Sequence, residues 1–375
     1  MGAAPMVRRW TSVVKNFFGR SLNAHLIAAL SCFSLAMCAS AHCHSGKLAA
    51  TAPSAAKPAS TRRRWERLLA NDRLDASHAL EALSRALLRD WGGRRLLLVL
   101  DETPNGPDLR CLRLGVAYRK RLLSVAAVCY PTDAPPLPMP QLVCRVLRRA
   151  VRLLPAQVEV TLLCDRGLAW PAVMDCVRKL GWGHVMRLQH STRVTLRDDR
   201  RVLLLLAGEL VRRRGQSWHG RARIFKKAGW RDAHVTAVWD RRSRAPWLLA
   251  ARADGHGPAG LRAAVAYAKR NWCEQTFRDE KSSGFHWDQS RVTDPARASR
   301  LVLVMVLATL LSISLGTWLI KTGRRRDLDP HRRRRLSVFQ LGLRWLRHLL
   351  LTTTTGADRD APILLPRYLP YLHPS

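Results

Sequence analysis

Two runs of apolar residues that each end in an aspartate constrain the fold more than any other feature of this chain. Residues 96–100 read LLLVL and are followed by Asp101, and residues 160–164 read VTLLC and are followed by Asp165. Continuous apolar runs of this length are typical of strands that are buried on both faces of a sheet. Because such strands need helices on both faces, the two runs predict an α/β architecture.

The periodicity of the neighbouring segments predicts the order of the other elements. Residues 112–120 and 121–131 have the pattern of two further strands, and another strand is expected at 183–189. Helical spacing at 140–154 and 171–181 places one helix before and one after the second acidic strand. The resulting order, β-β-β-α-β-α-β, predicts a mixed sheet with helices on its faces.

Residues 191–260 differ from this core because they contain short strand-like pieces that are rich in arginine and tryptophan. We expect a β-rich insertion there. The predicted parts of the chain are therefore 1–60, an N-terminal helical region that ends in a Pro-, Ala- and Ser-rich linker at 51–60; 61–93, a helical lead-in; 94–190, the first part of the core; 191–260, the insertion; 261–322, the remaining core helices; and 323–375, a basic C-terminal tail that is a candidate for dimerisation or DNA contact.

Two apolar segments resemble membrane signals. Residues 25–41 follow basic residues and end in an Ala-x-Ala-like sequence, as a signal peptide does, and residues 301–320 are long enough to span a bilayer. Arginine on both sides of the second segment, and Ser, Thr and Gly within it, favour a buried central helix instead. We expect no membrane partner, and a secreted or membrane protein remains an alternative that cell fractionation would test.

The charge and the cysteines indicate the partner and the compartment. The chain has 64 Lys and Arg residues against 27 Asp and Glu, a formal charge of +37, which favours a polyanionic partner such as nucleic acid.

The 9 cysteines of the chain form no CxxC pair, so they predict buried thiols in a reducing, cytosolic compartment. His42, Cys43 and His44 are adjacent, and adjacent residues rarely face one metal ion, so we expect no metal site there.

The segment YAKRNWCEQTFRDEK, residues 267–281, concentrates polar side chains of different kinds. At about 100° per residue, Tyr267, Arg270, Glu274 and Lys281 fall within a stripe of roughly 60° on one helix face. One interpretation is a solvated face with an ion pair between Arg270 and Glu274. The other interpretation is a functional face, and the aspartates at the ends of the two strands favour it.

Three carboxylates could meet at one place in this fold. Asp101 and Asp165 converge if their strands are neighbours, and Glu274 supplies a third acid from the helix. Glu102 points to the other face of its strand because strand side chains alternate. Three carboxylates can hold a pair of Mg²⁺ ions that activate water or a 3′-hydroxyl for attack on a phosphodiester. Arg270 and Lys281 could bind the flanking phosphates.

These residues carry a family resemblance. The helix matches the pattern Y-(2)-R-(3)-E-(6)-K at every position, and the segments VLDETP and LLCDRG contain Asp101 and Asp165. The chain, over about residues 60–320, resembles the YREK-signature DDE transposases of bacterial insertion sequences, the insertion-sequence-four family.

The resemblance implies an RNase H-like catalytic core with the β-rich insertion between the second aspartate and the glutamate. It implies that Asp101, Asp165 and Glu274 form a catalytic triad for a two-metal Mg²⁺ site, with Mn²⁺ able to substitute. It also implies that Tyr267, Arg270 and Lys281 contact double-stranded DNA near the cleaved bond, and that residues 1–60 bind the DNA end. Some family members stack a flipped base on an inserted tryptophan, and the candidates here are Trp218, Trp230, Trp239 and Trp247.

With this resemblance, the sequence predicts a cytoplasmic, nucleoid-associated DNA transposase. The resemblance implies that it acts as a homodimer on terminal inverted repeats and target DNA. It would cut and paste by metal-dependent hydrolysis and transesterification. Two alternatives share the fold: a catalytically inactive, transposase-derived DNA-binding protein, and a nuclease or resolvase. Cutting without joining would favour the nuclease, and binding without cutting would favour the inactive protein.

Overall fold

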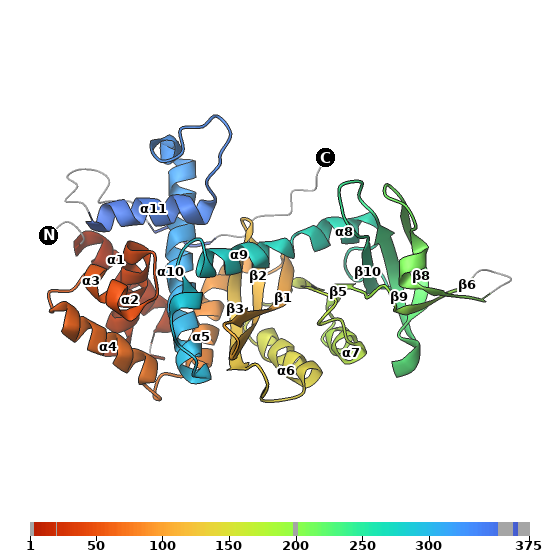
Figure 1. The fold of residues 1–375 in the computed structure, drawn as a ribbon, viewed down its shortest axis with the longest axis horizontal. Helices are drawn as coiled ribbons and strands as arrows, with labels where there is room; N and C mark the ends of the chain where they lie inside the picture. Colours follow the sequence, from red (N-terminus) through yellow and green to blue (C-terminus); the bar gives the residue numbers. More distant parts are fainter. Residues whose placement is uncertain (1–3, 20, 198–201, 352–362, 367–375) are drawn as a thin grey trace.

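The computed structural model describes residues 4–19, 21–197, 202–351 and 363–366, and one large mixed sheet runs through the middle of this part of the chain. The strand order is β3-β2-β1-β4-β5-β10-β9-β8-β6-β7. Helices near the N-terminus gather on one side of a long central helix, α10, and the sheet lies on the other side (Figure 1). The predicted mixed α/β architecture with an N-terminal helical region is confirmed.

The first five strands and two helices have the predicted order. They are β1 (Arg95–Asn105), β2 (Leu109–Tyr118), β3 (Arg121–Pro131), α6 (Met139–Val151), β4 (Glu159–Cys164), α7 (Pro171–Lys179) and β5 (Gly183–Arg187). The strands β1, β2 and β3 are antiparallel neighbours, whereas β4 pairs in parallel with both β1 and β5. The parallel pairs are possible because α6 and α7 return the chain to the starting edge of the sheet.

The register of β1 and β4 places the two aspartates at the same edge of the sheet. Leu100 lies opposite Cys164, and Asp101 and Asp165 are the residues that follow these two. Leu97 and Val99 pack toward one face of the sheet, and Leu96, Leu98 and Leu100 pack toward the other. Asp101 continues the first of these sets because strand side chains alternate, so it faces the same side as α8 and α9.

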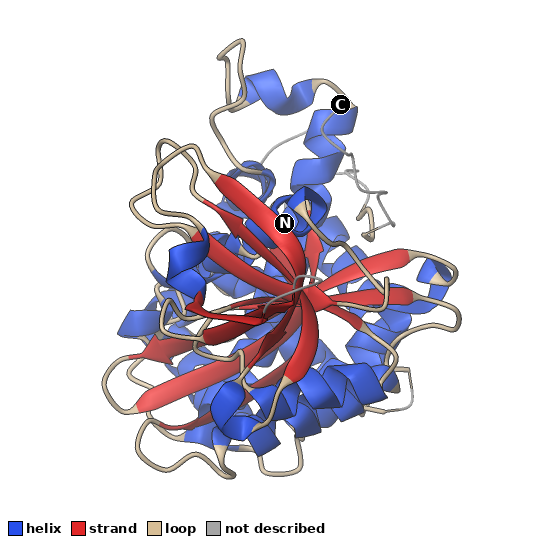
Figure 2. Ribbon diagram, turned by 90° about the vertical axis from the view of Figure 1, so that its right-hand side faces the viewer, coloured by secondary structure: helices blue, strands red, loops and turns tan. Residues whose placement is uncertain are grey.

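The β-rich insertion extends the core sheet. Its strands are β6 (Arg193–Arg197), β7 (Val202–Leu206), β8 (Ser217–Ile224), β9 (Arg231–Val238) and β10 (Trp247–Arg252). The last of these strands, β10, pairs antiparallel with β5 and joins the insertion to the core. Figure 2 shows the strands fanning out through a strong twist, as expected for a sheet of this width. The predicted insertion is thus made of strands, and it is continuous with the core.

Five helices precede the sheet within the described residues. They are α1 (Ala4–Phe18), α2 (Ala24–Ser40), α3 (Ser45–Thr51), α4 (Pro58–Ala70) and α5 (Ala76–Leu88). The linker is shorter than predicted, since only residues 52–57 lie between helices. Pro58 takes a position in the first turn of α4, where its missing N–H has no partner to lose.

The two apolar segments that resemble membrane signals are helices of the core. Most side chains in the second half of α2 are buried, and α2 packs against α10 (Pro295–Lys321) and α11 (Val338–Leu351). In the described part of the chain α10 alone is long and apolar enough to cross a membrane, unless α2 and α3, which are bent by 98°, count as one span. The apolar window of α10 is 94% buried, as expected for the predicted central helix.

The region 323–375 contains a packed helix where we expected a basic tail. At the crossing of α10 and α11, a Cβ atom on Gly316 would lie 1.8 Å from the carbonyl oxygen of Val338. A Cβ atom on Gly342 would lie 1.7 Å from the carbonyl oxygen of Ser312. The two helices therefore touch through glycines, and any larger residue would separate them. Most of the chain beyond α11 lies outside the described residues.

A buried histidine makes the stability of this fold depend on pH. His184 on β5 is 0% exposed, and neither ring nitrogen has a hydrogen-bond partner. Burial, followed by the nearby Arg252 and Arg178, lowers the pKa of His184 to about 3. The unfolded chain, with a histidine pKa of about 6.5, takes up the proton first, so we expect unfolding free energy to fall by up to about 1.4 kcal/mol per pH unit below pH 6.5.

Urea denaturation between pH 7 and pH 4 measures this dependence. His184→Leu, which removes the titrating group from the core, should flatten the profile by the same amount. His78→Leu, at an exposed position on α5, serves as the control and should leave the profile unchanged. Equal profiles for the wild type and His184→Leu would contradict the prediction.

Candidate active site

The polar stripe of residues 267–281 lies on two helices rather than on one. Tyr267 is in the last turn of α8 (Leu261–Ala268), and Glu274 and Lys281 are in α9 (Asn271–Lys281). At the junction the Arg270 N–H donates to the Tyr267 carbonyl at 2.8 Å, and the Cys273 N–H donates to the Arg270 carbonyl at 3.0 Å. These bonds span three residues, so the chain tightens into a 3₁₀ turn there. The prediction of a single helix was wrong because a uniform period of 3.6 residues cannot detect one tight turn.

The guanidinium of Arg270 contacts all three of the predicted acidic residues. Its Nη2 atom lies 2.9 Å from Oδ2 of Asp101 and 3.8 Å from Oδ2 of Asp165. Its Nη1 atom donates to Oε1 of Glu274 at 2.5 Å. The arginine is mostly buried, and its Nε has no hydrogen-bond partner. The fold therefore gathers Asp101, Asp165 and Glu274 around one cation from within β1, from the residue after β4 and from the first turn of α9.

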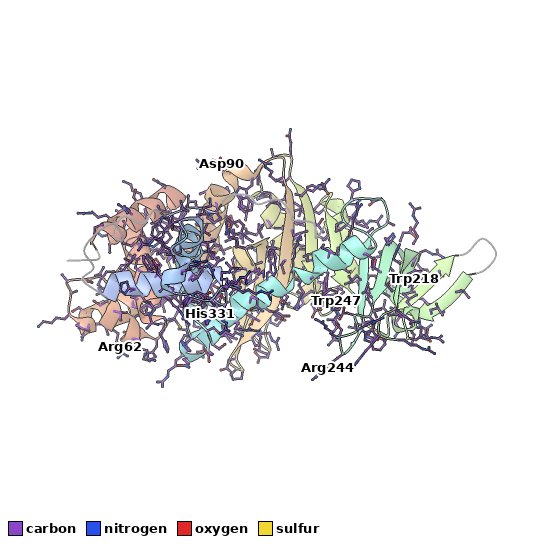
Figure 3. The ribbon with its side chains drawn as sticks, turned by 90° about the horizontal axis from the view of Figure 1, so that it is seen from above. Arg62, Asp90, Trp218, Arg244, Trp247 and His331 are labelled. Atoms are coloured by element: carbon purple, nitrogen blue, oxygen red, sulfur yellow. The ribbon has the colours of Figure 1, made fainter. Side chains whose placement is uncertain are left out.

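Tyr267 joins this cluster, and Trp247, one of the predicted tryptophans, supports it. The Tyr267 hydroxyl donates to Oδ1 of Asp165 at 2.9 Å. The Trp247 ring packs edge-on against the Tyr267 ring at 5.3 Å between centroids. Figure 3 shows Trp247 beside the helices that carry the cluster, whereas Trp218 lies farther out on the insertion. Among the predicted tryptophans, Trp247 is thus the one packed against a candidate site residue.

Arg187 also contacts the cluster, and the sequence did not single it out. Its Nη1 atom lies 3.9 Å from Oδ1 of Asp165. It is the last residue of β5, the third parallel strand, and the ends of parallel strands meet at one edge of the sheet. The same reasoning that identified Asp101 and Asp165 would have found Arg187 if it had been applied to β5.

Lys281 lies apart from the acids. Its Nζ donates to Oγ1 of Thr103 at 2.7 Å and also to the carbonyl oxygen of Pro104. Seven residues of helix separate it from Glu274, a rise of about 10 Å. The helix face thus brings Arg270 and Glu274 together, and it places Lys281 against the end of β1, beyond Asp101.

The two aspartates have different electrostatic environments. Burial raises the pKa of Asp101, although Arg270 and the Glu102 N–H oppose this shift. Burial also acts on Asp165, but the Arg166 N–H, Arg270 and Tyr267 together outweigh it, so the pKa of Asp165 is lowered. Asp165 is half exposed to the edge of the sheet, whereas Asp101 lies deeper. Asp165 is therefore the acid that stays ionised most readily.

The three carboxylates have the chemistry to bind a hard divalent cation, but in this structure they are arranged around the guanidinium of Arg270. Three carboxylates and no sulfur or imidazole ligand are the chemistry that Mg²⁺ and Mn²⁺ prefer. In the described residues, no group of three or more His, Cys, Asp or Glu side chains is arranged to hold a metal ion as it stands. A cation could therefore enter once Arg270 withdraws. His42, Cys43 and His44 form no such group either.

The mixed sheet and the acid cluster together are typical of α/β proteins whose active sites lie at one edge of the sheet, near the carboxyl ends of parallel strands. Residues 138–311 match the family model of the transposase DDE domain. No curated protein matches the chain. The chain thus contains a DDE transposase domain, which implies DNA transposition and phosphoryl transfer on DNA. The matched residues include Asp165 and Glu274, and Asp101 precedes them.

Proposed function

We propose that this protein is a DNA transposase of the insertion-sequence-four, YREK-signature type, with Asp101, Asp165 and Glu274 as its catalytic residues. One observation carries the proposal: the guanidinium of Arg270 holds together these three carboxylates, which lie on β1, directly after β4 and on α9. The strand order β3-β2-β1-β4-β5, in which β2 runs antiparallel to the other four strands, also supports an RNase H-like core.

The three carboxylates would hold a pair of Mg²⁺ ions, or Mn²⁺ in their place. When bound, this metal pair supplies activation of water or of a 3′-hydroxyl and stabilises the leaving oxygen of the phosphodiester. Tyr267 orients Asp165 through its hydroxyl, and Trp247 supports the tyrosine ring. Arg270 binds the carboxylates in the DNA-free state and a backbone phosphate when DNA is present. Lys281 binds a second phosphate beyond Asp101.

A basic cavity beside Asp165 supplies further phosphate contacts. It has a volume of about 580 Å³ and includes Arg166, the residue after Asp165, together with Arg193, Lys226 and Lys227. The exposed arginines of α4, in the helical lead-in, form a second basic surface next to the N-terminal helical region. We propose that the cavity binds DNA near the cleaved bond and that the N-terminal region, residues 1–60, binds the element end. The protein would act as a homodimer in the cytoplasm, associated with the nucleoid, on terminal inverted repeats and target DNA.

Binding to DNA should be strongly dependent on salt. The logarithm of the affinity should fall linearly with the logarithm of the salt concentration, with a slope of about −0.9 for each phosphate contacted. Lys227→Ala should reduce the magnitude of this slope by about one, because the lysine lies in the basic cavity. Lys179→Ala is the matched control, because the cavity includes Pro171 at the start of α7 and Lys179 is at the other end of this helix. Fluorescence anisotropy with a labelled duplex measures both, and a slope near zero would exclude extensive phosphate contact.

The experiment that tests the proposed function uses purified protein, Mg²⁺ and a plasmid that carries the DNA flanking this gene. Cuts at defined ends, followed by insertion elsewhere, would support the transposase if Asp165→Ala abolishes both. Cuts without joining would favour a nuclease or resolvase of the same fold. Binding to the ends without any cut would favour a catalytically inactive, transposase-derived DNA-binding protein.

A further inference from the structure

The buried side of α9 carries charged residues where apolar ones would be expected. Asp279 and Glu280 are 3% and 1% exposed, and Thr276 is 1% exposed. All three face the antiparallel strands β2 and β3, which cover this side of the helix. The same helix presents Glu274 and Lys281 to the proposed active site, so the contacts of its buried side set the position of both.

Glu280 is held by a fully buried arginine on β2. The Nη1 and Nη2 atoms of Arg113 donate to Oε1 and Oε2 of Glu280 at 3.0 and 2.9 Å, and Nη1 also donates to Oγ of Ser124 at 2.9 Å. Arg113 is 0% exposed. A bidentate pair of this kind fixes distance and orientation together, which a single hydrogen bond does not.

Arg113 is also the cross-strand neighbour of Asp101. The two residues lie opposite each other in the register of β1 and β2, so their side chains leave the same face of the sheet. The guanidinium of Arg113 nevertheless bonds to Glu280, and the charge beside Asp101 is supplied by Arg270. Glu280 therefore keeps a second, immobile arginine away from a proposed metal ligand.

Two more contacts fix α9 on the same pair of strands. Nε of Arg121, at the start of β3, donates to Oδ2 of Asp279. The Leu122 N–H donates to Oγ1 of Thr276 at 2.8 Å. With the Arg113 pair, these contacts connect three residues of α9 within little more than one turn to the strands that adjoin β1.

A general stability argument does not account for the Arg113–Glu280 pair. Replacing a buried ion pair with apolar residues of similar volume is often neutral or stabilising, whereas removing one partner is strongly destabilising. The pair is directional, and it links the strand beside Asp101 to the helix of Glu274. We propose that Arg113 and Glu280 are positioning residues, which set the distance between Glu274 and Asp101 and leave Asp101 free to bind a cation. This inference rests on the proposed function, since it concerns the same site.

The test compares the double variant Arg113→Met/Glu280→Met with the wild type. The double variant removes both charges and keeps both volumes, so it should fold with a melting temperature near that of the wild type and bind DNA as well. Its affinity for Mn²⁺, measured by the electron paramagnetic resonance of the free ion, should fall by about 10- to 100-fold. DNA cleavage should fall by about 100-fold, as expected for a displacement of about 1 Å at the reacting groups.

A second ion pair provides the matched control. Arg231 and Asp175 also form a bidentate pair, with contacts of 2.9 and 2.8 Å, but they link the insertion to α7, away from the acids. Arg231→Met/Asp175→Leu should leave Mn²⁺ affinity and cleavage unchanged. Glu280→Met alone leaves Arg113 buried, unpaired and next to Asp101, so it should be less stable than the double variant.

The possible outcomes separate this inference from the proposed function. A double variant with wild-type Mn²⁺ affinity and cleavage would overturn the positioning role and leave the transposase standing. A double variant that fails to fold would also overturn it, because the pair would then be structural. A wild-type protein that neither binds Mn²⁺ nor cuts DNA would overturn the proposed function and this inference together.

Discussion

Asp165→Asn should abolish strand cleavage while DNA binding survives. Asparagine keeps the volume of the side chain and can still accept the hydrogen bond from Tyr267, but it removes the negative charge that holds the cation. We expect a loss of about 1,000-fold or more, equivalent to about 4 kcal/mol of transition-state stabilisation. Cleavage of a labelled element end measures the rate, and anisotropy with the same duplex measures binding.

Asp175→Asn controls for the loss of one acidic residue elsewhere in the same domain. This aspartate lies on α7 and pairs with Arg231 on β9, away from the three acids. Its replacement should therefore leave the cleavage rate nearly unchanged. A normal rate for Asp165→Asn would remove Asp165 from the site, and loss of DNA binding by Asp165→Asn would indicate a folding defect instead.

Arg270→Gln should have opposite effects on metal binding and on cleavage. In the DNA-free protein the guanidinium neutralises the three carboxylates and occupies the space between them. Glutamine leaves the carboxylates to repel one another, so we expect Mn²⁺ to bind at least about tenfold more tightly, a gain of about 1.4 kcal/mol. Cleavage should nevertheless fall by about 100-fold, because the phosphate contact of Arg270 is lost.

Lys281→Gln is the control for the effect on metal binding. Lys281 contacts Thr103 and Pro104 rather than the acids, so its replacement should not change Mn²⁺ affinity in the absence of DNA. Unchanged or weaker Mn²⁺ binding by Arg270→Gln would show that the arginine does not compete with the cation.

The sequence predicted the parts of the fold in which one local pattern is sufficient. The apolar runs before Asp101 and Asp165 identified two buried strands, and their parallel pairing follows from the helix between them. The helix predicted over 171–181 stops at Gly181, whose φ of +72° is a conformation that glycine takes without strain. The buried helix α10 was recognisable from its length and from the residues that flank it.

The remaining parts depend on contacts that a local pattern does not contain. The 3₁₀ turn at Arg270 brings the guanidinium to Asp101 and Asp165, which are more than 100 residues away in sequence. The alignment of β10 beside β5 joins the insertion to the core sheet, and the glycines of α10 and α11 allow these two helices to touch. Each of these features is set by two distant segments together.

The candidate site also contains residues that a local pattern predicts and residues that depend on distant contacts. Its acids were predictable because the carboxyl ends of neighbouring parallel strands converge. Arg113 was not, since a lone arginine in an apolar strand gives no sign that it will meet Glu280 on a helix far along the chain. The catalytic roles of Asp101, Asp165 and Glu274 stay predictions until they are measured.

The most direct test of the central claim is metal rescue of Asp101→Cys. Asp101 precedes the residues that match the transposase DDE domain, so its role as a ligand depends most on the geometry described above. A thiolate binds Mg²⁺ poorly and accepts the softer Mn²⁺ more readily. If Asp101 holds the cation, the variant will be inactive in Mg²⁺ and will regain cleavage in Mn²⁺. Cleavage in Mg²⁺ at the wild-type rate would contradict the claim.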